Sequence, residues 1–147
     1  MKNMRGLASV EFAIVASVLM TVIFGCLEFG RAMYTYAALN EGTRRAARLA
    51  AVCPIGDAKI SAAVNFLGAP GFNDNNNVSV TYLDANGDSL GGAPAIANVY
   101  YVQVSVVGYS VPLAIPFLTE TLTSPPFTVT LPAESLGWSG AGVSTAC

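Results

Sequence analysis

The sequence predicts an α+β protein in which a long N-terminal helix, partly transmembrane and partly amphipathic, carries a small domain with a short helix and an antiparallel sheet. Residues 1–52 contain no proline, and residues 31–51 are rich in residues that favour helices. Residues 7–30 are nearly all apolar or small, and about 20 such residues cross a bilayer as a helix. Short alternating segments after residue 77, separated by turn-forming residues, predict the sheet.

The composition argues against most enzymes and against nucleic-acid-binding proteins. The chain has 147 residues, of which 53% are hydrophobic and 11% charged, whereas an average soluble domain has about 25% charged residues. Past Lys59 no cation is available to neutralise a phosphate backbone, so nucleic-acid binding is not expected. Histidine, the commonest general base and transition-metal ligand, is absent. We therefore expect no catalytic site, metal or cofactor.

The apolar run, residues 7–30, is the membrane-spanning candidate. Lys2 and Arg5 precede it, and the positive-inside tendency then keeps the N-terminus in the cytoplasm. The rest of the chain is expected outside the cytoplasm. The helix should continue through residues 31–52, because its composition still favours a helix, and from residue 7 to about residue 50 it would be roughly 66 Å long.

The extramembrane part of this helix is predicted to be amphipathic. Its solvent side carries Glu41, Arg44, Arg45 and Arg48, and Glu41 is spaced to pair with Arg44 or Arg45. The side expected to pack comprises Met33, Tyr36, Ala37, Ala47 and Ala50.

The remaining residues predict a small mixed domain. Pro54 and Gly56 end the long helix, and a shorter helix is predicted over Asp57–Leu67. A polar loop, 71–77, follows. Strands are predicted at Val78–Leu83, Asn98–Val107 and Phe127–Leu131, with a turn over Asp84–Asp88.

Three cysteines are distributed between the two regions. Cys53 and Cys147 would both lie outside the cytoplasm, where disulfides persist. A bridge between them would fasten the tail to the end of the long helix and stabilise the fold by about 4–5 kcal/mol in the chain-entropy estimate. The alternative is a pair of unpaired thiols. Cys26 lies within the apolar run, where a cysteine acts as a small apolar residue.

The N-terminal junction suggests proteolytic processing. A short basic leader ends at Gly6, and Glu11-Phe12 follows within an otherwise apolar segment that begins at Leu7. A secretory signal peptide would have a shorter apolar core, of about 7–15 residues, with its cleavage site just after it. The junction instead resembles the processing site of prepilins.

More closely, residues 6–48 resemble the TadE-like family of the tight-adherence (Flp) pilus system, a type IV-like pilus. The resemblance rests on Val10-Glu11-Phe12-Ala13, Phe24-Gly25, Glu28-Phe29-Gly30-Arg31 and Arg45-Ala46-Ala47-Arg48. It implies that a prepilin peptidase cuts after Gly6, which makes Leu7 the new N-terminus. It also implies a minor pilin, or pseudopilin, of the bacterial inner membrane that supports pilus biogenesis, adhesion and surface colonisation.

The resemblance assigns assembly roles to Glu11, Phe12, Glu28 and Arg31. A carboxylate in an apolar helix costs a few kcal/mol unless it is paired, and the pilin hypothesis supplies the freed α-amino group of an adjacent subunit. Alternatively, Glu11 lies at the membrane interface near a helix N-terminus. Glu28 and Arg31 either pair with each other at the outer interface or contribute to subunit packing.

The chain then divides into a leader (1–6), the long helix (7–52) and an outer domain (53–147). The implied partners are major and minor pilin subunits, the prepilin peptidase, the inner-membrane assembly platform and, before assembly, membrane lipid. The alternative hypothesis is an uncleaved single-pass protein whose outer domain binds a ligand or partner. Such a protein would keep residues 1–6 and would not depend on a peptidase.

Overall fold

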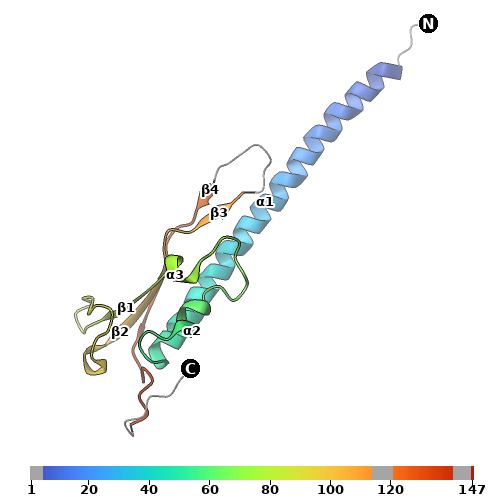
Figure 1. The fold of residues 1–147 in the computed structure, drawn as a ribbon. Helices are drawn as coiled ribbons and strands as arrows, with labels where there is room; N and C mark the ends of the chain where they lie inside the picture. Colours follow the sequence, from blue (N-terminus) through green and yellow to red (C-terminus); the bar gives the residue numbers. More distant parts are fainter. Residues whose placement is uncertain (1–4, 114–120, 141–146) are drawn as a thin grey trace.

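The computed structural model describes residues 5–113, 121–140 and 147. It shows a long helix with a small domain packed along its outer half, residues 31–52 (Figure 1). Helix α1 comprises Arg5–Val52, and its 48 residues rise through roughly 72 Å. The other elements, in chain order, are α2 (Ala58–Ala62), α3 (Asp74–Asn77), β1 (Val78–Leu83), the 3-10 helix η1 (Ile96–Asn98), β2 (Tyr101–Val106), β3 (Ser110–Pro112), β4 (Thr121–Thr123) and β5 (Phe127–Pro132). The predicted α+β class is confirmed.

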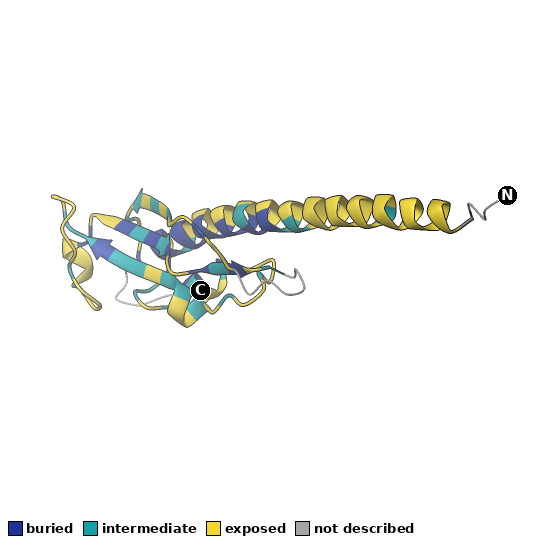
Figure 2. Ribbon diagram, turned by 90° about the horizontal axis from the view of Figure 1, so that it is seen from above, coloured by how far each residue is buried: buried dark blue, intermediate teal, exposed yellow. Residues whose placement is uncertain are grey.

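Helix α1 has two halves with different surroundings. Residues 6–30 are exposed on nearly every side, whereas residues 31–52 have one buried side against the domain (Figure 2). The buried positions recur every three or four residues, which is the spacing of one side of a helix. They are mostly small: Ala32, Thr35, Ala38, Leu39, Gly42, Thr43, Ala46, Ala47, Ala50 and Ala51. Small side chains allow the domain to approach the helix axis closely.

The main sheet packs one face on this side of α1. Its strand order is β1-β2-β5, and both strand pairs are antiparallel. In the central strand Val102, Val104 and Val106 are fully buried, because alternate side chains of a strand point to the same face. The register places Val104 between Val80 and Val129. A separate two-stranded sheet, which the sequence analysis did not predict, pairs β3 with β4.

Gly42 marks a very close approach of the domain to α1. A Cβ atom at this position would lie 2.0 Å from the backbone oxygen of Val64 and 2.8 Å from its carbonyl carbon. These distances leave room only for glycine. The contact brings Leu39 of α1 into one buried cluster with Ile60 and Val64 of the domain.

The second helix is shorter than predicted. The pattern indicated a helix over 57–67, but α2 has only five residues. Beyond α2 the backbone closes a tighter turn, in which Val64 N donates to the carbonyl oxygen of Ser61. The carbonyl oxygen of Val64 lies against Gly42 of α1. Packing on α1 therefore overrides the local preference for a longer helix.

Two other segments differ from the prediction, while β1 and β5 lie where the alternation places them. The expected loop 71–77 contains the one-turn helix α3, whose N-cap residue Asn73 accepts a hydrogen bond from Asn75 N. Strand β2 begins at Tyr101, later than predicted, because residues 96–98 form the 3-10 turn η1.

The packing side of α1 is rotated from the predicted one. Ala47 and Ala50 are buried and Tyr36 is half-buried, as expected, but Met33 and Ala37 are exposed. The prediction was wrong for these two positions because it relied on apolar residues. The true packing side is centred on Thr35, Leu39 and Ala46, and positions two residues before and after Thr35 fall on the opposite side of the helix.

The predicted turn after β1 is confirmed. The Oδ1 atom of Asp84 accepts hydrogen bonds from the backbone N–H of Asn86 and of Asp88, each at 2.8 Å. The bond from Asp88 is the main cause that lowers the pKa of Asp84. The charged carboxylate therefore supports the turn above the pKa of an unfolded Asp, and this support is lost as the pH falls through the lower folded-state pKa.

We predict that Gly42→Ala lowers the free energy of unfolding by roughly 1–3 kcal/mol, the usual cost of overpacking. The added methyl group would force Val64 away from α1. Urea unfolding of the chain in detergent, followed by Trp138 fluorescence, measures the change. Gly25→Ala is the matched control, because a Cβ at Gly25 meets nothing within 4 Å. An unchanged unfolding midpoint for Gly42→Ala would contradict the prediction.

Candidate functional site

The exposed half of α1 is the most unusual surface of the molecule. Among the residues described, α1 is the helix that is long and apolar enough to cross a membrane, with a mean hydropathy of 2.3 over a stretch that is not buried. Phe12 is 75% exposed and Phe29 is 66% exposed. Soluble monomers rarely expose apolar surface of this extent, so this half needs lipid or other protein around it.

The residues of the predicted cleavage site lie at the start of α1. Gly6 and Leu7 belong to its first turn and are exposed, and a Cβ at Gly6 would meet nothing within 4 Å. The first backbone N–H groups of a helix have no partner within the helix, and helix ends fray. The backbone of this first turn is therefore held less firmly than the interior of the helix. Residues 1–4 of the predicted leader lie outside the described residues.

Glu11 and Phe12 project from the exposed half of α1. Within the described part of the chain, Glu11 has no ion pair or hydrogen-bond partner, and one helical turn away on either side it meets only apolar side chains, Leu7 and Val15. A partner for this carboxylate must therefore come from outside the described residues. The two interpretations offered by the sequence, a neighbouring subunit and the membrane interface, both supply one.

Glu28 and Arg31 lie at the boundary between the two halves of α1, where the domain begins to cover the helix. Arg31 Nη2 donates to Glu28 Oε2 at 2.8 Å, and it also donates to the carbonyl oxygen of Pro112. The Glu28 side chain is 17% exposed and the Arg31 side chain 34%. The pair thus connects α1 to the end of β3 within one chain. Sequence spacing indicated the pair but contained no signal for Pro112.

Tyr109 completes the base of the domain beside Arg31. Its hydroxyl donates to the carbonyl oxygen of Pro70 at 2.8 Å, and its ring meets Phe72 edge-on at 5.3 Å between centroids. Burial raises the pKa of the Tyr109 phenol, and the positive charge of Arg31 lowers it in part. This cluster, which the sequence analysis missed, holds the membrane-proximal end of the domain to α1.

The solvent side of the outer half of α1 is basic. Arg45 pairs with Glu41 at 3.2 Å, one of the two pairings that the sequence allowed, and lies 4.0 Å from the ring centroid of Phe66. Both partners of the ion pair are about half exposed, so the pair itself adds little stability.

Cys53 and Cys147 are joined by a disulfide in the structure, with their Cα atoms 5.7 Å apart. Cys53 is fully buried at the end of α1. Cys26 is a free, exposed cysteine on the apolar half of the helix. The structure thus adopts the bridged alternative rather than two unpaired thiols.

The C-terminal segment also caps α1 through its backbone. The last carbonyl groups of a helix have no partner within the helix. Here Glu134 N donates to the carbonyl oxygen of Ala51 at 3.0 Å, and Gly137 N donates to that of Val52 at 2.6 Å. The hydroxyl of Ser135 adds a bond to the oxygen of Val52 at 3.1 Å. The distal end of α1 is therefore closed by residues more than eighty positions later in the chain.

We predict that Cys147→Ser lowers the free energy of unfolding by about 4–5 kcal/mol, because the bridge closes a loop between residues 94 positions apart. Urea unfolding under non-reducing conditions measures the loss, and a reductant should produce the same change in the wild-type chain. Cys26→Ser is the control, since this thiol is free. The prediction fails if the two cysteine variants have equal midpoints.

Comparisons with known proteins bear on the N-terminal helix alone. Neither the comparison with curated proteins nor that with solved structures found a match. A family model described as TadE-like protein matches residues 6–48. The matched residues comprise the exposed apolar half of α1 and most of its packed half. Residues 6–48 of this chain therefore form a TadE-like segment, and the resemblance found in the sequence is confirmed.

Proposed function

We propose that this protein is a minor pilin of a tight-adherence type IV-like pilus. The TadE-like match associates the chain with that pilus system, and the apolar half of α1 suggests a membrane anchor. The observation that carries the proposal is the division of α1: the domain covers one side of residues 31–52 and leaves residues 6–30 uncovered. Such a helix suits a subunit that lipid surrounds first and other subunits surround later.

In this proposal a prepilin peptidase cuts the precursor between Gly6 and Leu7, and the mature helix then assembles. Lipid tails are about as apolar as leucine, so leaving the bilayer gains little hydrophobic free energy. Assembly must therefore rely on close packing and on polar pairs between helices. The freed α-amino group of Leu7 offers Glu11 of an adjacent subunit such a partner, and this pair would set the register between them.

The proposed domains are a leader (1–6), the assembly helix (7–52) and an outer domain (53–147). The outer domain makes the chain much larger than a subunit consisting of the helix alone, which favours a place at the pilus tip or base and a role in priming or adhesion. The proposed location is the bacterial inner membrane, with a cytoplasmic N-terminus. Its partners are other pilins, the peptidase and the inner-membrane assembly platform.

A second candidate is an uncleaved, membrane-anchored binding protein. One observation favours it: the bond between Gly6 and Leu7 lies inside α1, so a peptidase would have to unwind the first turn. The same anchor would then hold the outer domain permanently at the membrane surface.

We predict that the chain, expressed in membranes with a prepilin peptidase of the tight-adherence type, begins at Leu7, and that the Gly6→Leu chain still begins at Met1. The side chain of leucine at position 6 would block a peptidase that requires glycine there. Intact-mass measurement and N-terminal sequencing identify the first residue of each chain. Gly25→Leu is the control for a glycine replaced elsewhere in α1. Retention of residues 1–6 by the wild-type chain would support the anchored binding protein instead.

We also predict that Glu11→Gln is cleaved normally but enters pili at least tenfold less often. The amide removes the charge that would pair with the α-amino group of a neighbour and leaves the cleavage site intact. Immunoblots of sheared pili, normalised to the membrane fraction, measure incorporation. Glu41→Gln removes an exposed carboxylate on the outer half of α1 and is the matched control. Equal incorporation of both variants would exclude Glu11 as an assembly residue.

A further inference from the structure

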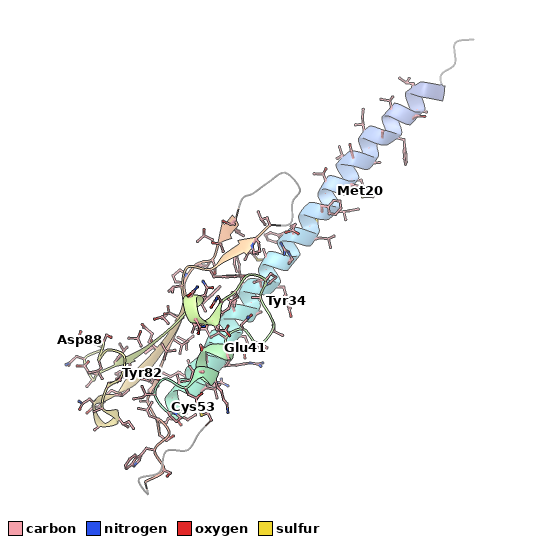
Figure 3. All side chains as sticks on the ribbon, in the orientation of Figure 1. Met20, Tyr34, Glu41, Cys53, Tyr82 and Asp88 are labelled. Carbon is pink, nitrogen blue, oxygen red and sulfur yellow. A yellow bond between two sulfur atoms is a disulfide. The ribbon has the colours of Figure 1, made fainter. Side chains whose placement is uncertain are left out.

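A hollow lies between α1 and the segment 64–70, next to the base of the domain. Its volume is about 190 Å³. The α1 wall includes Arg31, Tyr34 and Ala38, whose spacing places them on one side of the helix, and the opposite wall includes Leu67. Tyr34 is 59% exposed and Leu67 is 47% exposed. Figure 3 shows Tyr34 on α1 between Met20 of the uncovered half and Glu41 of the covered half.

The height of the hollow along α1 places it at the membrane surface. Residues 7–30 are about 36 Å long, slightly more than the roughly 30 Å hydrocarbon core. Arg31 comes directly after them, and Tyr34 is only about 4.5 Å farther along the helix axis. The headgroup layer on each side of a bilayer is roughly 5–7 Å thick. The lower end of the hollow therefore lies at headgroup depth.

The chemistry of the hollow matches that depth. Tyrosine is enriched at membrane interfaces, where its ring lies among lipid groups and its hydroxyl reaches water. Arg31 is the one charged residue among those that line the hollow within the described chain. A guanidinium has five N–H donors, and the contacts to Glu28 and Pro112 use Nη2 alone. Nε is buried without a partner, so the two N–H groups of Nη1 remain to bind a phosphate oxygen. The apolar walls can accept the upper part of an acyl chain.

We propose that this hollow binds a phospholipid of the outer leaflet, so that the base of the domain rests on the bilayer that holds α1. The inference depends on the membrane anchor in the proposed function but not on peptidase cleavage. The hollow is continuous with the exposed apolar half of α1 directly below it. This continuity indicates that the lipid around α1 also covers the hollow. Assembly into a pilus must remove this lipid together with those around the helix.

The single tryptophan makes a direct test possible. Trp138 lies at the opposite end of the domain, since its neighbour Gly137 bonds to the last residue of α1. The full chain is placed in vesicles of phosphatidylcholine brominated close to its ester groups, which quench nearby tryptophan. We expect Leu67→Trp in a Trp138→Phe background to be quenched several-fold more than native Trp138.

Phe24→Trp in the same background reports on the anchor itself. If it is quenched while Leu67→Trp is quenched no more than native Trp138, the anchor stands and the lipid site is refuted. If neither is quenched, the anchor and the lipid site both fail. Tyr34→Trp repeats the test from the α1 wall in case Leu67→Trp destabilises the domain, which urea unfolding would reveal. No peptidase is present, so the outcome is independent of cleavage.

Discussion

The close packing of the domain on the small-residue side of α1 is the constraint on which the rest of the structure depends. Because Gly42 has no side chain, the backbone at Val64 can contact α1 directly. The buried valines of β2 pack against the same side of α1. The bond from Arg31 to Pro112 fastens the end of this contact next to the uncovered half of α1. The disulfide and the capping bonds of residues 134–137 fasten the other end. The domain is thus held along half of α1 and leaves the other half uncovered.

Local patterns predicted the parts of this structure that local forces determine. The proline-free N-terminus predicted α1, and alternation followed by a turn predicted β1 because both signals lie within a few residues. The length of α2 was overestimated because Val64 is positioned by a glycine in another element. The packing side of α1 was misplaced for the same reason, since close approach favoured small residues such as Thr35 over Met33.

In the candidate site, too, local sequence predicted some features and contacts between distant residues determined others. Gly6, Glu11 and Glu28 could be placed from the sequence because a helix converts their spacing directly into positions. The bond from Arg31 to Pro112 could not, because it joins residues 81 positions apart. Nor do the described residues supply a partner for Glu11, which in the proposed function belongs to a neighbouring subunit. The proposed function therefore depends on what surrounds the uncovered half of α1.

The disulfide has a mechanical consequence for a protein that is anchored at one end. The bridge joins Cys53, which directly follows α1, covalently to Cys147, 94 positions later in the chain. A pull applied at Cys147 would pass through the bridge into α1 without crossing the sheet. The strands would then bear no tension. The force that the subunit withstands would be set by how firmly its surroundings hold α1, and not by the stability of the domain against unfolding.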